Sequence, residues 1–237
     1  MLPANIDNLL FSGGWLDRLK LYCMPRAIIG EAYPCAVRTV RALQDAGLQP
    51  VFVSARQRLA RRNTLYWLHE HGLDTAQLHL SPLTLPESAR AAWKRSVIQR
   101  LRQEHALMPV AGVGDRPSDL QAYSDSGIRA IGVFQGTSSR AGVPSAQGSA
   151  EGPLAFKDGA TNALQPHEQL AHVYSMLPAT AASRAAVTLH VLAGSFGVGG
   201  AAFQPPFDTH VHATQSQLWE AVKADVLEAA EGAACDR

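Results

Sequence analysis

The sequence predicts an α/β domain with a Rossmann-like parallel sheet and helices on both faces, followed by an extension of unspecified fold. Short apolar runs alternate with helical patterns across the first 134 residues, which is typical of a parallel sheet. Three of these runs lead directly into a polar residue: Asp7, Ser54 and Asp115. Right-handed crossovers bring the carboxyl ends of such strands to one edge, where ligands bind.

The strands are predicted from β-branched and aromatic runs, and the helices from apolar residues at three- or four-residue spacing. The run Pro-Val-Phe-Val-Ser at 50–54 indicates a buried strand, and Gly47 and Gly72 end the two helices that flank it. In chain order the prediction is a strand at 2–6, a helix at 36–46, strands at 50–54 and 77–80 separated by a helix at 58–71, a helix at 87–105, a strand at 109–113, a helix at 118–126 and a strand at 128–134.

The chain changes character after Phe134. Residues 135–165 are rich in Gly, Ser and Ala and predict a flexible linker or loop. Residues 166–237 form a C-terminal extension in which a helix at 166–177, a strand at 187–193 and a helix at 217–230 are plausible. We therefore expect an α/β domain at 1–134, a linker at 135–165 and an extension at 166–237.

The composition narrows the class of protein. Hydrophobic residues make up 46% of the chain, enough for a sizeable core, and the formal net charge of +1 argues against nucleic-acid binding as the main function. No apolar run is long enough for a transmembrane helix, and the first residues lack the pattern of a secretory signal. The three cysteines show no metal or disulfide spacing. A cytoplasmic protein is expected.

The strongest local signal is the run Gly-Val-Gly-Asp-Arg-Pro-Ser-Asp at 112–119. It places two carboxylates, Asp115 and Asp119, at a turn from a strand into a helix. Hard cations such as Mg²⁺ prefer oxygen ligands and retain several waters, so two carboxylates on one side suffice. The alternative is that both residues only cap the helix by accepting hydrogen bonds from its first N–H groups.

Two further segments carry groups that suit a phosphate. Ser54 closes a buried strand and Arg56 follows it, so a hydroxyl and a guanidinium could both reach a phosphate at the sheet edge. Lys94 lies on the predicted helix before the Asp115 strand, where an ammonium could offset the charge of a carboxylate and a phosphate together. Arg90 and Arg95 compete with Lys94, since basic pairs on helices usually face solvent.

The order of these segments resembles motifs two, three and four of the haloacid-dehalogenase-like (HAD) superfamily. The residues concerned are Val-Phe-Val-Ser-Ala-Arg at 51–56, Lys94, and Val-Gly-Asp-Arg-Pro-Ser-Asp-Leu-Gln-Ala-Tyr at 113–123 followed by Ser-Gly-Ile. The fourth motif is similar to that of the lipin-type phosphatase branch. The resemblance covers residues 1–134 and implies a magnesium-dependent phosphatase in which Ser54 and Lys94 stabilise the phosphate.

In that family the first motif is Asp-x-Asp, whose first carboxylate attacks phosphorus and whose second acts as acid and base. The matching residues here are Asn5 and Asp7, so Asp7 takes the acid/base position and joins Asp115 and Asp119 as a metal ligand. Asn5 stands at the nucleophile position, and an amide is a far poorer nucleophile than a carboxylate. Three explanations remain open: a non-catalytic relative, a shifted alignment of this motif, or a start that lies further upstream.

The spacing of the motifs leaves no room for a large cap domain. In the family, a capless site implies a large phosphorylated substrate such as a lipid or a protein. The rival interpretation is a phosphate- or phospholipid-binding regulatory module of the same fold without turnover. A third is a plain Rossmann-like domain without a retained site.

Other patterns are not assigned a function. The His-x-His pair formed by His210 and His212 resembles the metal motif that opens amidohydrolase barrels, but only 25 residues follow His212 and such barrels need about 200 or more. The glycine-rich run at 194–200 lacks the Lys-Ser or Lys-Thr of a phosphate loop. A basic cluster after Ser54 is expected to face solvent, although it adjoins the predicted phosphate edge; it comprises Arg56, Arg58, Arg61 and Arg62.

Overall fold

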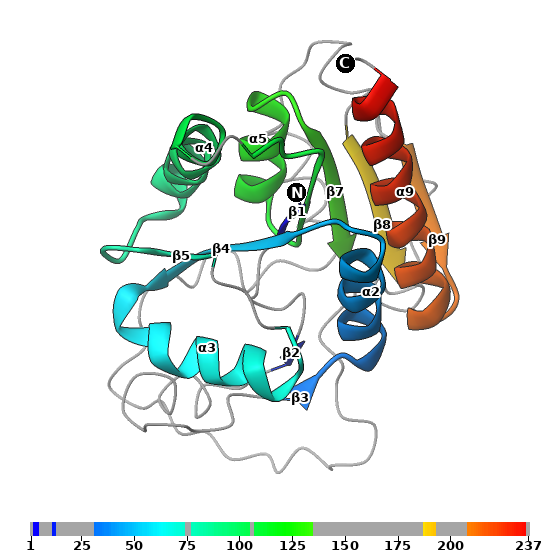
Figure 1. The fold of residues 1–237 in the computed structure, drawn as a ribbon, viewed down its shortest axis with the longest axis horizontal. Helices are drawn as coiled ribbons and strands as arrows, with labels where there is room; N and C mark the ends of the chain where they lie inside the picture. The colour runs from blue at the N-terminus through cyan, green and yellow to red at the C-terminus, as the bar shows by residue number, and fades with distance from the viewer. Residues whose placement is uncertain are drawn as a thin grey trace, which may run out of the picture.

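The computed structural model describes residues 2–4, 11–12, 31–73, 77–104, 107–134, 187–192 and 208–235. Seven strands form one sheet in the order β5-β4-β1-β6-β7-β8-β9, and every neighbouring pair is parallel (Figure 1). The strands are β1 (Leu2–Ala4), β4 (Pro50–Gln57), β5 (Leu78–Ser81), β6 (Ala111–Gly114), β7 (Arg129–Phe134), β8 (Val187–Leu192) and β9 (Asp208–His212). A separate antiparallel ribbon joins β2 (Phe11–Ser12) to β3 (Glu31–Ala32).

Helices cover both faces of the sheet (Figure 1). One face packs against α4 (Glu87–Glu104) and α5 (Pro117–Asp125), through residues such as Val97, Leu101 and Leu120. The other face carries α2 (Pro34–Asp45), α3 (Arg61–Glu70) and α9 (Gln215–Cys235), with a short 3₁₀ turn η1 (Arg58–Ala60) before α3. The predicted fold class, a parallel sheet between two helical layers, is therefore confirmed.

The predicted strand ending at Ser54 continues to Gln57. Pairing with β5 passes from Ser54↔Leu80 to Gln57↔Ser81, so β4 contains an irregularity of the β-bulge type between these positions. Bulges at the rim of a sheet redirect side chains and often adjoin functional sites. Here the bulge allows the strand to carry Arg56 as well as Ser54 to the edge.

The C-terminal elements complete the same sheet and core. β8 pairs with β7 and β9 pairs with β8, while α9 packs beside α2 and contributes Leu218, Trp219 and Val222 to the largest hydrophobic cluster. The Thr39 hydroxyl of α2 donates a hydrogen bond to the Trp219 carbonyl at 3.3 Å. The sequence had suggested β8 and α9 but not β9, because Asp-Thr-His-Val-His lacks the apolar alternation of a half-buried strand.

The predicted linker at 135–165 and the possible helix at 166–177 fall outside the described residues. Within the described ranges, no helix combines the length and the apolar content that crossing a bilayer requires.

Candidate functional site

The register of the central strands sets the frame of the site. Ala4 at the end of β1 pairs with Phe52 of β4 on one side and with Val113 of β6 on the other. Ser54 and Asp115 each lie two residues beyond those partners. They therefore flank the point where the chain leaves β1, about 10 Å apart across two strand spacings. Asn5 and Asp7 follow β1 but lie outside the described residues, so the first motif remains a prediction.

The Ser54 side chain is fully buried at this edge. Its Oγ accepts a hydrogen bond from the Arg56 backbone N–H at 3.3 Å. This bond holds the Ser54 hydroxyl in a fixed orientation at the sheet edge. The Arg56 side chain is also buried, with 9% of its surface exposed.

Lys94 and Asp119 meet in a buried ion pair between Nζ and Oδ1. Both side chains are almost completely excluded from solvent, with 2% and 0% exposed. Lys94 reaches this position from α4, and Asp119 from the first turn of α5. The competing residue Arg95 instead forms a pair with Asp125 at 2.6 Å on the surface. The structure thus singles out Lys94, because burying a charge without a partner is costly.

Two glycines allow this close packing. A Cβ atom on Gly114 would lie 2.7 Å from Oδ2 and 2.9 Å from Cγ of Asp119, so only glycine leaves space for the carboxylate against β6. A Cβ on Gly112 would likewise overlap the ring of Tyr123. The glycines of the Gly-Val-Gly-Asp run are therefore explained by the helix that packs on them.

The pKa of Tyr123 reflects the negative charges of the two carboxylates. Its hydroxyl donates to the Val113 carbonyl at 3.4 Å, and its side chain is buried. Burial, followed by the negative charges of Asp119 and Asp115, holds the pKa of Tyr123 well above its usual value. Both carboxylates therefore act on the same buried neighbourhood. The sequence placed Tyr123 in the fourth motif but gave it no role.

The carboxylates have the chemistry that Mg²⁺ prefers. Asp115 is half-buried just after β6, and Asp119 is fully buried with one oxygen on Lys94. Among the residues that the structure describes, no group of three or more His, Cys, Asp or Glu side chains is placed to hold a metal ion. The third predicted ligand, Asp7, lies outside that set. Since Mg²⁺ uses one or two carboxylates and keeps several waters, Asp115 and Asp119 fit the ion.

The rim beside Ser54 is basic and apolar. Arg58 and Arg62 are exposed there, whereas Arg61 donates from Nη1 to the Leu78 carbonyl at 2.7 Å. The arginine cluster is thus only partly a solvated face. Leu59 and Leu83 are 78% and 70% exposed, in η1 and in the segment after β5. Gln57 and Thr84 hydrogen-bond to each other and join these two segments.

Residues 25–135 are similar to the LNS2 domain of PITM 1-3, whose family model they match. LNS2 domains of lipin and PITM proteins have a HAD-like fold, so the HAD-like resemblance is confirmed for this part of the chain. The matched range contains Ser54, Lys94, Asp115 and Asp119 but begins after Asn5 and Asp7. No curated protein matches the chain.

Solved structures that resemble the chain include HAD-superfamily phosphatases. D,D-heptose 1,7-bisphosphate phosphatase from B. bronchiseptica, complexed with magnesium and phosphate, is 17% identical with a TM-score of 0.42, over 56% of this chain and 79% of that one. A protein described as a predicted phosphoglycolate phosphatase, from Haemophilus somnus, is 13% identical with a TM-score of 0.39. The match covers 56% of this chain and 84% of that one. The cobalt-bound deoxy-D-mannose-octulosonate 8-phosphate phosphatase from Haemophilus influenzae is 20% identical with a TM-score of 0.37, over 56% and 67%. At these scores the likenesses support no particular substrate or metal for this chain.

Proposed function

We propose that this chain, HAD-like over residues 25–135, is a magnesium-dependent phosphate-binding domain of the HAD phosphatase type whose turnover is impaired by Asn5. The observation that carries the proposal is the buried Lys94–Asp119 pair under the end of β6. A protein that kept only the fold would gain little from this pair, because apolar residues of similar size are often as stable as a buried ion pair.

Each residue of the proposed site has a distinct task. Asp115 and Asp119 hold the cation, which when bound offsets the charge of the phosphate oxygens. Ser54 donates to a phosphate oxygen, and the Lys94 ammonium neutralises negative charge shared between Asp119 and the phosphate. Asp7 takes the acid/base position. Without a carboxylate at position 5, no aspartyl-phosphate forms there, which favours binding over hydrolysis.

The substrate that we propose is a phosphomonoester presented on a large surface, such as a phospholipid in a bilayer. The exposed leucines Leu59 and Leu83 and the exposed Arg58 and Arg62 adjoin the proposed phosphate edge. Apolar side chains among cationic ones match a lipid surface that carries anionic head groups.

Replacing Asn5 with aspartate is expected to raise magnesium-dependent phosphate release from near background by at least about tenfold, since removing a catalytic nucleophile costs up to about 10⁶ in another enzyme class. Release is measured from p-nitrophenyl phosphate and from phosphatidate vesicles, with the natural chain and with Asn5→Asp carrying Asp115→Ala. The vesicle arm should show the larger gain, and Asp115→Ala should abolish both.

Robust turnover by the natural chain would refute the impaired-enzyme proposal. If Asn5→Asp were inactive and the chain did not bind magnesium, the proposed site would be refuted. If Asn5→Asp released phosphate only from p-nitrophenyl phosphate, the proposed phosphatase site would be supported, but the proposal of a lipid substrate would be refuted.

A further inference from the structure

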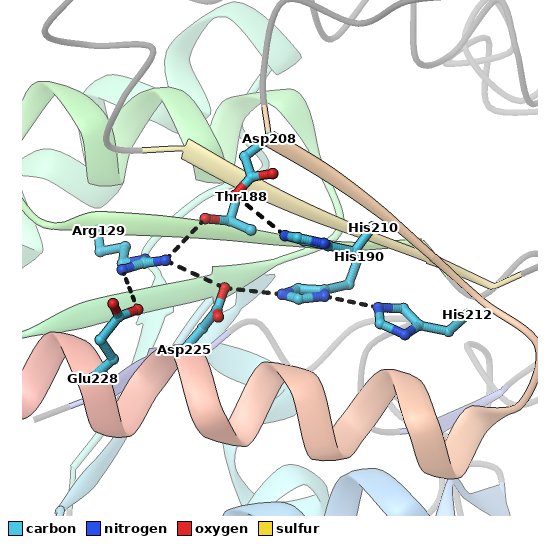
Figure 2. Close-up of polar contacts among 8 residues, drawn as sticks. All are labelled: Arg129, Thr188, His190, Asp208, His210, His212, Asp225 and Glu228. Carbon is cyan, nitrogen blue, oxygen red and sulfur yellow. Dashed lines mark hydrogen bonds and ion pairs between the residues drawn. The ribbon is translucent and has the colours of Figure 1, made fainter.

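Three histidines that the proposed phosphate site does not use gather at the far end of the sheet. His190 lies in β8, and His210 and His212 lie in β9. His190 pairs in register with His210, and residues two apart on a strand face the same side, so the three rings lie on one face of β8 and β9 (Figure 2). The rings of His210 and His212 stack on that of His190 at 5.4 and 5.2 Å between centroids.

A hydrogen-bond chain runs through this group from helix to edge strand. His190 Nε2 lies 3.1 Å from Asp225 Oδ2 on α9, and His190 Nδ1 lies 3.0 Å from His212 Nε2 (Figure 2). His190 is 1% exposed, whereas His212 is half-buried. The three side chains Asp225, His190 and His212 are called the histidine latch below, because they join α9, β8 and β9.

When both rings of the latch are neutral, the geometry fixes which nitrogens donate and which accept. An ionised carboxylate only accepts, so His190 donates to Asp225 from Nε2 and its Nδ1 is left as an acceptor. His212 must then donate from Nε2 to that nitrogen. One proton lies between the two facing nitrogens, and the bond is lost if both carry a proton.

A first added proton can be shared by the two rings, since Asp225 offsets its charge. A second would place two positive imidazoles in contact, with the ring of His210 stacked on that of His190. The remaining charged neighbours are Arg129 of β7, Glu228 of α9 and Asp208 of β9. Arg129 already lies 2.8 Å from Glu228 and 3.6 Å from Asp225, and Asp208 faces His210 at 3.2 Å on the surface.

The direction of titration follows the same geometry. Burial, and then the charges of His190 and His210, lower the pKa of His212 against an opposing effect of Asp225. Burial raises the pKa of Asp225, but the hydrogen bond and charge of His190, with Arg129 and His210, bring it below its usual value. A histidine with a lowered folded-state pKa stabilises the fold above its ordinary pKa of about 6.5, and this stability is lost as the pH falls below it.

We propose that the histidine latch is an acid-sensitive device that holds the edge strand β9 to β8 and α9 at neutral pH and releases it when the facing imidazoles take up a second proton. Within the described sheet, β9 has β8 as its strand neighbour, and its Val211 side chain is 69% exposed. Release therefore uncovers the edge of β8, while β4 and β6 stay paired with β1 between them.

Amide hydrogen exchange of the full chain at pH 7.5 and 5.0, corrected for intrinsic rates, tests the latch. Protection of β9 is expected to fall at least about tenfold at pH 5.0, while protection of β6 changes by less than about threefold. In His212→Gln the amide still donates to His190 but does not titrate, so protection at pH 7.5 should be retained and the pH response of β9 largely lost. His69→Gln, an exposed histidine on α3, should leave the response intact.

A second variant separates the latch from simple loss of packing. Asp225→Asn keeps an acceptor for His190 but removes the offsetting charge, so release should begin at higher pH than in the natural chain. Equal protection of β9 at both pH values in the natural chain would overturn the proposal, and so would a full pH response in His212→Gln.

Discussion

Replacing Lys94 with methionine is expected to lower the free energy of unfolding by about 3–5 kcal/mol, because Asp119 loses its countercharge in a site closed to water. The same change should abolish magnesium-dependent phosphate binding, since the proposal gives the Lys94 ammonium the task of neutralising the charge shared by Asp119 and the phosphate. Urea denaturation at pH 7 measures the first effect and calorimetry the second. Arg95→Met is the matched control: its pair with Asp125 is 45% and 19% exposed, so the cost should be about 1 kcal/mol or less.

A double variant distinguishes the two roles of Lys94. Lys94→Met combined with Asp119→Leu removes both charges and fills their place with apolar atoms, which is often neutral or stabilising. Stability should then recover toward that of the natural chain, while phosphate binding stays lost. A cost of less than 1 kcal/mol for Lys94→Met alone would mean that the pair is not buried as described.

Gly114→Ala is expected to be the second most damaging single change. The new Cβ would overlap Asp119 Cβ and lie 2.7 Å from Asp119 Oδ2. Asp119 Cβ is attached to the backbone of α5 and β6 lies in the interior of the sheet, so the helix must move away from the strand. Overpacking of this kind costs about 1–3 kcal/mol, and we expect a value near the upper end because the Lys94–Asp119 pair is disturbed as well. Thermal unfolding and magnesium titration measure the two effects.

Gly232→Ala provides the control within the same chain. A Cβ there meets nothing within 4 Å, and the residue lies in α9, where alanine favours the helix over glycine by about 1 kcal/mol. Gly232→Ala should therefore stabilise the protein slightly and leave the site unchanged. If Gly114→Ala and Gly232→Ala changed the stability equally, the close packing of Asp119 on β6 would be contradicted.

The α/β half was predictable because its strands are apolar runs with polar ends. Val51, Phe52 and Val53 are all fully buried, and such runs between helical patterns admit few arrangements. The order of the motifs also brought Ser54 and Asp115 to one edge in the prediction, as the register of β4, β1 and β6 does in the structure.

The partner of Lys94 could not be derived from the sequence. Helix α4 carries Arg90, Lys94 and Arg95 within two turns, and spacing alone does not tell which of them points inward. Lys94 is 1% exposed because Val97, Ile98 and Leu101 on the same helix also turn toward the protein interior. A pairing across 25 residues depends on the packing of α4 against α5, which local patterns do not determine.

The histidine latch was missed for a related reason. His190 interrupts an apolar strand and belongs to no motif, and the His-x-His of β9 resembles a metal motif of a different fold. The informative signal is the alternation of Thr188 and His190 in β8, which lies in register with that of Asp208 and His210 in β9. It becomes meaningful only once the two strands are known to pair.

The most direct test of the central claim, that Asp115, Asp119, Lys94 and Ser54 form one magnesium and phosphate site, is a calorimetric titration of inorganic phosphate into the full chain with and without Mg²⁺, beside Asp115→Asn. The natural chain should bind phosphate only when Mg²⁺ is present. Asp115→Asn, with its circular dichroism unchanged, should weaken that binding by at least about tenfold, about 1.4 kcal/mol. Absence of binding by the natural chain, or equal binding by Asp115→Asn, would contradict the account.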